Sequence, residues 1–115
     1  MHDFKFVFLD IIKESYSDII QKAEIIEERL RLTLYDESFI DILYPIPLKY
    51  SFHWQQKNKI FRFDTAPHHR DLITFPRHIH YETEINVIPD EILHGTSPEE
   101  NFKLFLDWVR LQQAR

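Results

Sequence analysis

The sequence has no cysteine and only one glycine, Gly95, among its 115 residues. The absence of cysteine excludes disulfides and thiolate metal sites. With one glycine, a chain rich in strands is expected to build its turns from asparagine, aspartate, serine, proline and lysine. No stretch approaches the roughly 20 apolar residues that cross a bilayer, and the N-terminus lacks a basic region followed by a clean apolar run. We therefore expect a soluble, cytoplasmic protein without membrane contact.

Large apolar side chains are abundant: 43% of the residues are hydrophobic and 15% are aromatic. This composition is typical of a packed globule rather than of a disordered chain. The length is close to the most common size of one domain, and two halves would each be too short to bury a core. We expect a single domain over residues 1–115.

The net charge of −5 is unevenly spread along the chain. Residues 49–80 carry six Lys and Arg against two Asp and Glu, whereas both flanking segments are acidic. The same segment holds five of the seven histidines. A basic, imidazole-rich region between acidic segments suits a phosphate or an acidic partner, and chance clustering in a short chain is the alternative explanation.

The hydrophobic periodicity predicts an α+β fold. Spacing typical of a helix covers residues 4–23, and a period of two follows in four segments: from about residue 26 to 34, 39–44, 48–55 and 59–64. Residues 65–95 show little periodicity and read as a long, ordered, histidine-rich loop. Ser97 and Glu100 form a capping box with a proline between them, so a second helix starts there. The expected architecture is a four-stranded antiparallel meander flanked by an N-terminal and a C-terminal helix.

Strand register also follows from the pattern. For the first hairpin, a three-residue loop at 36–38 places the apolar faces of the two strands together, with Leu34 opposite Ile40 and Leu32 opposite Ile42. For the hairpin that turns at 57–58, aromatic residues pair on one face and polar residues on the other. Its expected pairs are Trp54 with Phe61, Phe52 with Phe63, His53 with Arg62, and Ser51 with Asp64.

Three short motifs lie in and after the second hairpin: YSFHW at 50–54, FRFDTAPHH at 61–69 and TFPRHIH at 74–80. Together they resemble the TumE-type proteins, the toxins of bacterial and archaeal toxin–antitoxin modules. The resemblance covers residues 28–90 and is most specific at Tyr50, His53, Trp54, Arg62, Phe63, Asp64, Ala66, Pro67, His68, His69, Phe75, Pro76, His78 and His80. The sequence departs from the family pattern at Thr65, where asparagine is expected, and at Arg77, where a histidine is expected.

The resemblance implies a growth-inhibiting toxin that is neutralised by a cognate antitoxin. The residue types suggest metal-independent RNA cleavage, in which histidines move protons and arginine stabilises charge on the phosphate. Exposed aromatic rings such as Tyr50 or Trp54 would stack on a base. The candidate catalytic residues are His68, His69, His78, His80, Arg62 and Asp64, and the candidate substrate-binding residues are His53, Tyr50 and Arg77.

Three other interpretations stay open. The same segment suits a divalent transition metal held by Asp64, His68, His78 and His80, since two imidazoles in a His-x-His pair lie on one side of an extended chain. The histidines also suit a structural role, bonded to loop carbonyls. A non-catalytic binding module that docks on a cellular target would need no convergent acid–base set.

The broad apolar stripe of the last helix leaves room for a homodimer.

Overall fold

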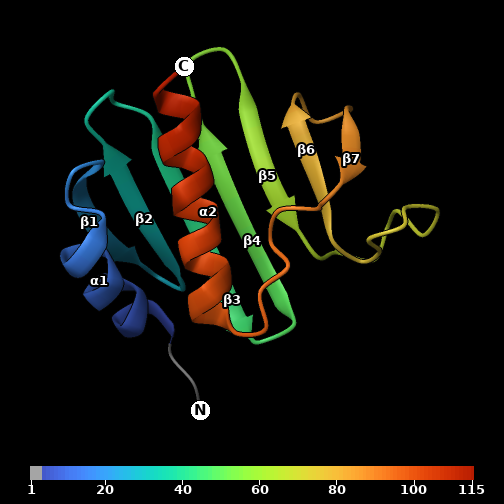
Figure 1. Cartoon of the computed structure of the whole chain (residues 1–115), viewed down its shortest axis with the longest axis horizontal. Helices are drawn as coiled ribbons and strands as arrows, with labels where there is room; N and C mark the ends of the chain where they lie inside the picture. Colours follow the sequence, from blue (N-terminus) through green and yellow to red (C-terminus); the bar gives the residue numbers. More distant parts are fainter. Residues whose placement is uncertain (1–3) are drawn as a thin grey trace.

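The computed structural model describes residues 4–115 as a seven-stranded antiparallel sheet with one helix at each end of the chain (Figure 1). The strands are neighbours in chain order, so the sheet is a continuous meander. The elements are α1 (Phe4–Ser15), β1 (Ile20–Ile26), β2 (Arg29–Leu34), β3 (Phe39–Ile46), β4 (Lys49–Gln55), β5 (Ile60–Asp64), β6 (His78–Glu82), β7 (Val87–Pro89) and α2 (Pro98–Gln113). The predicted α+β class is confirmed, and the predicted number of four strands is wrong.

Both helices cover the same face of the sheet, and α2 crosses its centre (Figure 1). Phe8 of α1 stacks on Phe102 of α2 with ring centroids 4.1 Å apart, and Phe105 stacks on Phe52 of β4 at 4.7 Å. The apolar stripe of α2 packs against the sheet of the same chain, where Trp108 contacts Phe61 and Phe63 of β5. The breadth of that stripe therefore no longer argues for a homodimer.

The helix predicted over 4–23 ends at Ser15, and residues 20–26 form β1 instead. Tyr16 accounts for the ending, since its carbonyl accepts from the N–H groups of Ile19 and Ile20 in a turn. Its hydroxyl donates to Asp107 of α2 at 2.8 Å, which fixes the turn against the second helix.

The segment 65–95, predicted to be irregular throughout, contributes two further strands, β6 and β7. Apolar alternation does not reveal β6, because His78, Ile79 and His80 are all buried although only the middle one is apolar. Within residues 4–115, no helix is long and apolar enough to cross a membrane.

The predicted register of β2 and β3 is wrong by two residues: Leu32 pairs with Ile40 and Leu30 with Ile42. The turn closes one residue earlier than expected, since the Leu34 N–H donates to the Ser38 carbonyl at 2.9 Å. Asp36 stabilises this turn by accepting from both the N–H and the hydroxyl of Ser38. A shift of two keeps every side chain on its face, so the buried set is unchanged.

The predicted register of β4 and β5 is confirmed at all four pairs, from Trp54 with Phe61 to Ser51 with Asp64. The aromatic face of this hairpin lies under α2, with Phe52, Trp54 and Phe63 fully buried. The polar face carries His53 and Arg62 and points away from both helices.

The cap of α2 is confirmed, with the Ser97 hydroxyl accepting from the N–H of Glu100 at 3.1 Å. The carboxylate of Glu100 accepts from Thr96 rather than from the cap residue itself. Position 95 has room only for glycine, because a Cβ there would lie 2.7 Å from the Oδ1 atom of Asn101.

Three glutamates occupy the left-handed backbone conformation that usually favours glycine: Glu27 (φ 56°), Glu37 (φ 74°) and Glu82 (φ 69°). Glu27 directly follows β1, Glu37 lies in the turn between β2 and β3, and Glu82 ends β6. The expectation that turns would rely on asparagine, aspartate, serine, proline and lysine is therefore wrong at these positions.

Candidate functional site

A row of polar side chains crosses the face of the sheet that the helices leave uncovered, and strand register aligns it. Each member pairs with the next on the neighbouring strand, and alternation keeps them on one face. The row runs Arg31, Asp41, His53, Arg62, His80. A second row beside it contains Ser51, Asp64 and His78.

A cluster of three histidines, His69, His78 and His80, lies at the β6 end of these rows. The ring centroids are 4.7 Å apart for His69 and His78, 5.0 Å for His78 and His80, and 5.9 Å for His69 and His80. One nitrogen from each ring lies within 4.8 Å of the other two. We call this group the histidine cluster.

Backbone carbonyls orient the two strand histidines. The Nδ1–H of His78 donates to the Pro76 carbonyl at 3.0 Å, and the Nδ1–H of His80 donates to the Glu84 carbonyl at 2.7 Å. These bonds select the tautomer with a free lone pair on Nε2. Burial lowers the pKa of His78, and the neighbouring His80 and His69 lower it further. These effects favour the neutral form of the His78 imidazole.

Arg62 is held by two carboxylates. Glu84, in the turn after β6, accepts from both terminal nitrogens of the guanidinium at 2.6 Å, and Asp64 lies 3.4 Å from Nε. Hydrogen bonding to Arg62 lowers the pKa of Glu84. The charge of Arg62 is thus compensated, and a phosphate would reach this guanidinium only by displacing the half-exposed Glu84 side chain. Nothing in the sequence pattern singled out Glu84.

The two remaining histidines of the motifs lie apart from the histidine cluster. His68 is exposed, although its neighbour His69 turns inward. His53 lies in the polar row, where its Nε2 is 3.0 Å from the side-chain oxygen of Gln55. A hollow of about 300 Å³ adjoins His53 and Arg62 and extends over Arg29, Phe39, Asp41, Leu43 and Ser51.

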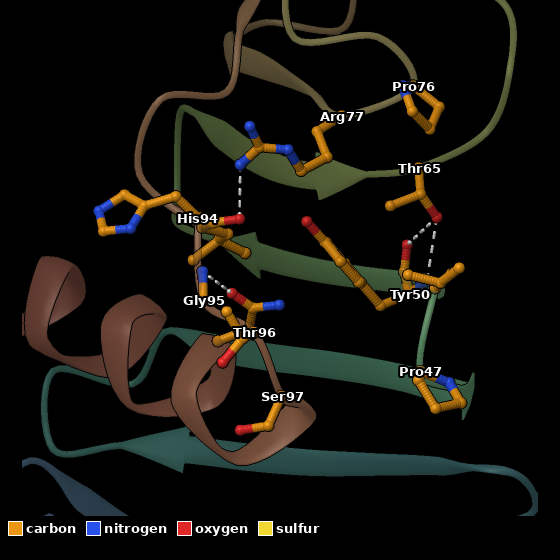
Figure 2. A pocket seen from close by; sticks show the side chains of 12 residues that line it. Pro47, Tyr50, Thr65, Pro76, Arg77, His94, Gly95, Thr96 and Ser97 are labelled. Atoms are coloured by element: carbon orange, nitrogen blue, oxygen red, sulfur yellow. Dashed lines mark hydrogen bonds between the residues drawn. The ribbon is translucent and has the colours of Figure 1, made fainter.

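Tyr50 and Arg77 line a different pocket, of about 420 Å³, on the helix-covered side near the start of α2 (Figure 2). Arg77 precedes His78, so alternation turns the two side chains to opposite faces of the sheet. The guanidinium of Arg77 donates to the Leu93 carbonyl at 2.6 Å. The structure therefore does not bring Tyr50 or Arg77 together with the histidine cluster.

The hydroxyl of Tyr50 points into this pocket, on the side of Arg77 (Figure 2), and has no hydrogen-bond partner in the described chain. Burial raises the pKa of this phenol, and the nearby Asp90 carboxylate adds to the effect. His94, to which the sequence gave no role, also lines the pocket.

Neither Tyr50 nor Trp54 of the YSFHW motif is an exposed stacking platform. Trp54 is fully buried and Tyr50 is 6% exposed, so the expectation that these rings would stack on a base is wrong. The indole N–H of Trp54 donates to the Ser38 hydroxyl at 2.9 Å, which is a structural contact.

A family model described as Toxin TumE matches residues 8–113, which is nearly the whole chain and includes all three motifs. No curated protein and no solved structure matches the chain.

Proposed function

Because the chain belongs to the TumE toxin family, and membership implies a cognate antitoxin, we propose that it inhibits growth by cleaving RNA on the helix-free face of its sheet. The observation that carries this proposal is the convergence of His69, His78 and His80 beside Arg62 and Asp64. No other part of the three motifs gathers so many groups able to move a proton or balance the charge of a phosphate.

Cleavage of RNA by its own 2′-hydroxyl sets the chemical requirements. The 2′ oxygen forms a bond to phosphorus, the bond from phosphorus to the 5′ oxygen breaks, and a cyclic phosphate results. A base takes the proton of the 2′-hydroxyl, and an acid gives a proton to the departing 5′ oxygen. Imidazole suits both transfers near neutral pH, and His69, His78 and His80 are the candidates that lie together.

Positive charge near the phosphate is the second requirement. Strand register places the cation Arg62 next to the cluster, since Arg62 pairs directly with His80. Its present partner, Glu84, lies in a turn and is half exposed. The proposal therefore includes exchange of the Glu84 carboxylate for a phosphate as the substrate enters. The hollow beside His53 and Arg62 extends this site along the sheet and accounts for a substrate-binding role of His53.

Tyr50 and Arg77 have no place in this reaction, because they open to the other side of the sheet. His68 has no place in the cluster, because it is exposed. The proposed machinery is thus narrower than the sequence suggested: His69, His78, His80, Arg62 and Asp64, with His53 beside them.

The test is induced expression in a bacterial host of the wild type, His69→Ala and His68→Ala, with growth and total RNA integrity as readouts. The two variants remove adjacent imidazoles from one loop, so they form a matched pair. We expect arrest and RNA cleavage by the wild type and by His68→Ala, and loss of both in His69→Ala, whose fold is checked by circular dichroism.

Arrest without RNA cleavage, or cleavage that is equal in both variants, contradicts the proposal. Arrest that persists unchanged in His69→Ala and in His80→Ala indicates instead a non-catalytic toxin that docks on a cellular target.

A further inference from the structure

The histidine cluster has the form of a metal site. Its three side chains each offer one nitrogen within 4.8 Å of the other two. His78 and His80 come from one strand and project on the same face, while His69 comes from the loop between β5 and β6. Two ligands on a rigid strand and one on a loop allow the site to close around an ion.

The hydrogen bonds behind the rings match those of metal-binding histidines. A ligating imidazole usually donates its second N–H to a carbonyl or a carboxylate, which fixes the tautomer and the ring orientation. His78 and His80 do this through the carbonyls of Pro76 and Glu84. Within residues 4–115, the Nε2 atoms of these two rings have no hydrogen-bond partner, so both lone pairs are available.

Burial is the third observation. His78 is 1% exposed and His80 is 8% exposed, so the protein buries two neighbouring imidazole rings. Neutral acceptors that face each other cannot bond to each other. A cation bound between such nitrogens uses one lone pair from each ring.

We propose that His69, His78 and His80 together bind one divalent transition-metal ion, with zinc as the first candidate. Imidazole nitrogen suits zinc, nickel and copper, and it is a poor ligand for magnesium. Zn–N bonds are about 2.0–2.1 Å long, so the rings must draw closer by roughly 1 Å. His69 is the ligand that lies on a loop rather than on a strand.

The ligand set differs from the one expected from sequence. His69 replaces the exposed His68. Asp64 drops out, since one of its oxygens accepts from the N–H of Ala66 at 2.7 Å and the other lies 3.4 Å from Arg62. Three protein ligands leave the fourth position of a tetrahedral ion for water or a substrate oxygen, as in catalytic zinc sites.

A catalytic role of this ion rests on the proposed function, whereas its binding does not. A bound ion would lower the pKa of its water and so supply the proton acceptor for the 2′-hydroxyl. The three imidazoles would then hold the ion rather than carry protons themselves. Arg62 and Glu84 keep the roles given above.

The experiment uses the purified full-length chain after treatment with EDTA and dialysis. Zn²⁺ is titrated calorimetrically, and Co²⁺ is titrated by its visible absorption, which is intense for tetrahedral coordination. We expect one ion per chain in the wild type and in His68→Ala. We expect at least a tenfold weaker affinity in His69→Ala, since loss of even a supporting contact costs about 10–100-fold. His69→Ala changes a loop residue, and His80→Gln serves as a second ligand variant if its fold is perturbed.

Wild-type protein that binds neither ion, or ligand variants that bind as tightly as His68→Ala, overturns the inference. Binding of one ion per chain by the wild type, lost in the ligand variants, supports the metal site. If the wild type binds the ion but leaves cellular RNA intact, only the proposed function is refuted. RNA cleavage by EDTA-treated, metal-free protein overturns the catalytic role of the ion and leaves the proposed function standing.

Discussion

The Ser38→Ala variant tests whether Trp54 is a structural residue. The indole of Trp54 is fully buried, and its N–H donates to the Ser38 hydroxyl at 2.9 Å. Ser38 in turn donates to Asp36, so one hydroxyl links the β2–β3 turn to the core of β4. Alanine at position 38 removes the acceptor and leaves the indole N–H buried without a partner.

The expected loss follows from this geometry. An unpaired buried donor costs about 1–3 kcal/mol, and the lost bond to Asp36 adds up to about 1 kcal/mol. We therefore expect Ser38→Ala to lower the free energy of unfolding by about 1–4 kcal/mol. Ser51→Ala is the matched control, because Ser51 is half-buried on the polar face of the same sheet, where substitutions change stability by about 0.5 kcal/mol or less.

Urea unfolding followed by circular dichroism measures both variants, and it avoids a signal that depends on the tryptophan itself. A double-mutant cycle with Trp54→Phe then isolates the pair, for which we expect a coupling of about 0.5–1.5 kcal/mol. A Ser38→Ala variant as stable as Ser51→Ala, or a coupling of zero, would refute the reasoning and reopen a functional role for the indole.

Three further outcomes follow from single contacts. Glu84→Gln leaves Arg62 without its closest carboxylate, so binding of a short single-stranded RNA, measured by fluorescence anisotropy, should tighten several-fold; unchanged binding would exclude Arg62 from the phosphate site. Glu37→Gly removes the strain of a non-glycine residue in the left-handed conformation (φ 74°), so urea unfolding should show a free energy of unfolding higher by up to about 1 kcal/mol. A lower free energy of unfolding would contradict this explanation. Burial raises the pKa of the Asp90 carboxyl, so its contribution to stability is present below the ordinary pKa and is lost as the pH rises through the folded value. Asp90→Asn should therefore flatten the dependence of the free energy of unfolding on pH above the ordinary carboxyl pKa of about 4, and an unaltered slope would contradict this assignment.

Sequence predicted the fold best where one face of an element is wholly apolar. The β4–β5 hairpin is the clearest case, because its alternation left one register in which aromatic and polar residues separate. The start of α2 was equally readable, since Ser97 and Glu100 stand at capping positions. Local chemistry decided both structures, and tertiary contacts only reinforced them.

The missed strands show what periodicity cannot detect. In β1 only Ile20 is buried, so the strand has no apolar face to read, and its helix-like spacing was misleading. In β6 the buried positions on one face are histidines. A pattern that counts apolar residues scores such a strand as a loop.

The candidate site was predicted in its residue types and not in its geometry. Arg62, Asp64, His78 and His80 share one face because the sheet continues from β5 to β6, a pairing that the sequence did not reveal. The loop conformation decides whether His68 or His69 turns toward the cluster. Because the two residues are adjacent and identical, the sequence pattern does not distinguish them.

The two missed features, β6 and the histidine cluster, have one physical cause. A strand whose inward side chains are imidazoles gains less from burial than an apolar strand, because each ring nitrogen must find a partner. The protein provides that partner for one nitrogen of His78 and one of His80 through backbone carbonyls. The second nitrogen of each ring makes no hydrogen bond within residues 4–115, and His69 lies next to both rings. The sheet therefore has less apolar packing at β6, where three imidazoles converge instead. Such a convergence suits the proposed cation site better than it suits an apolar core.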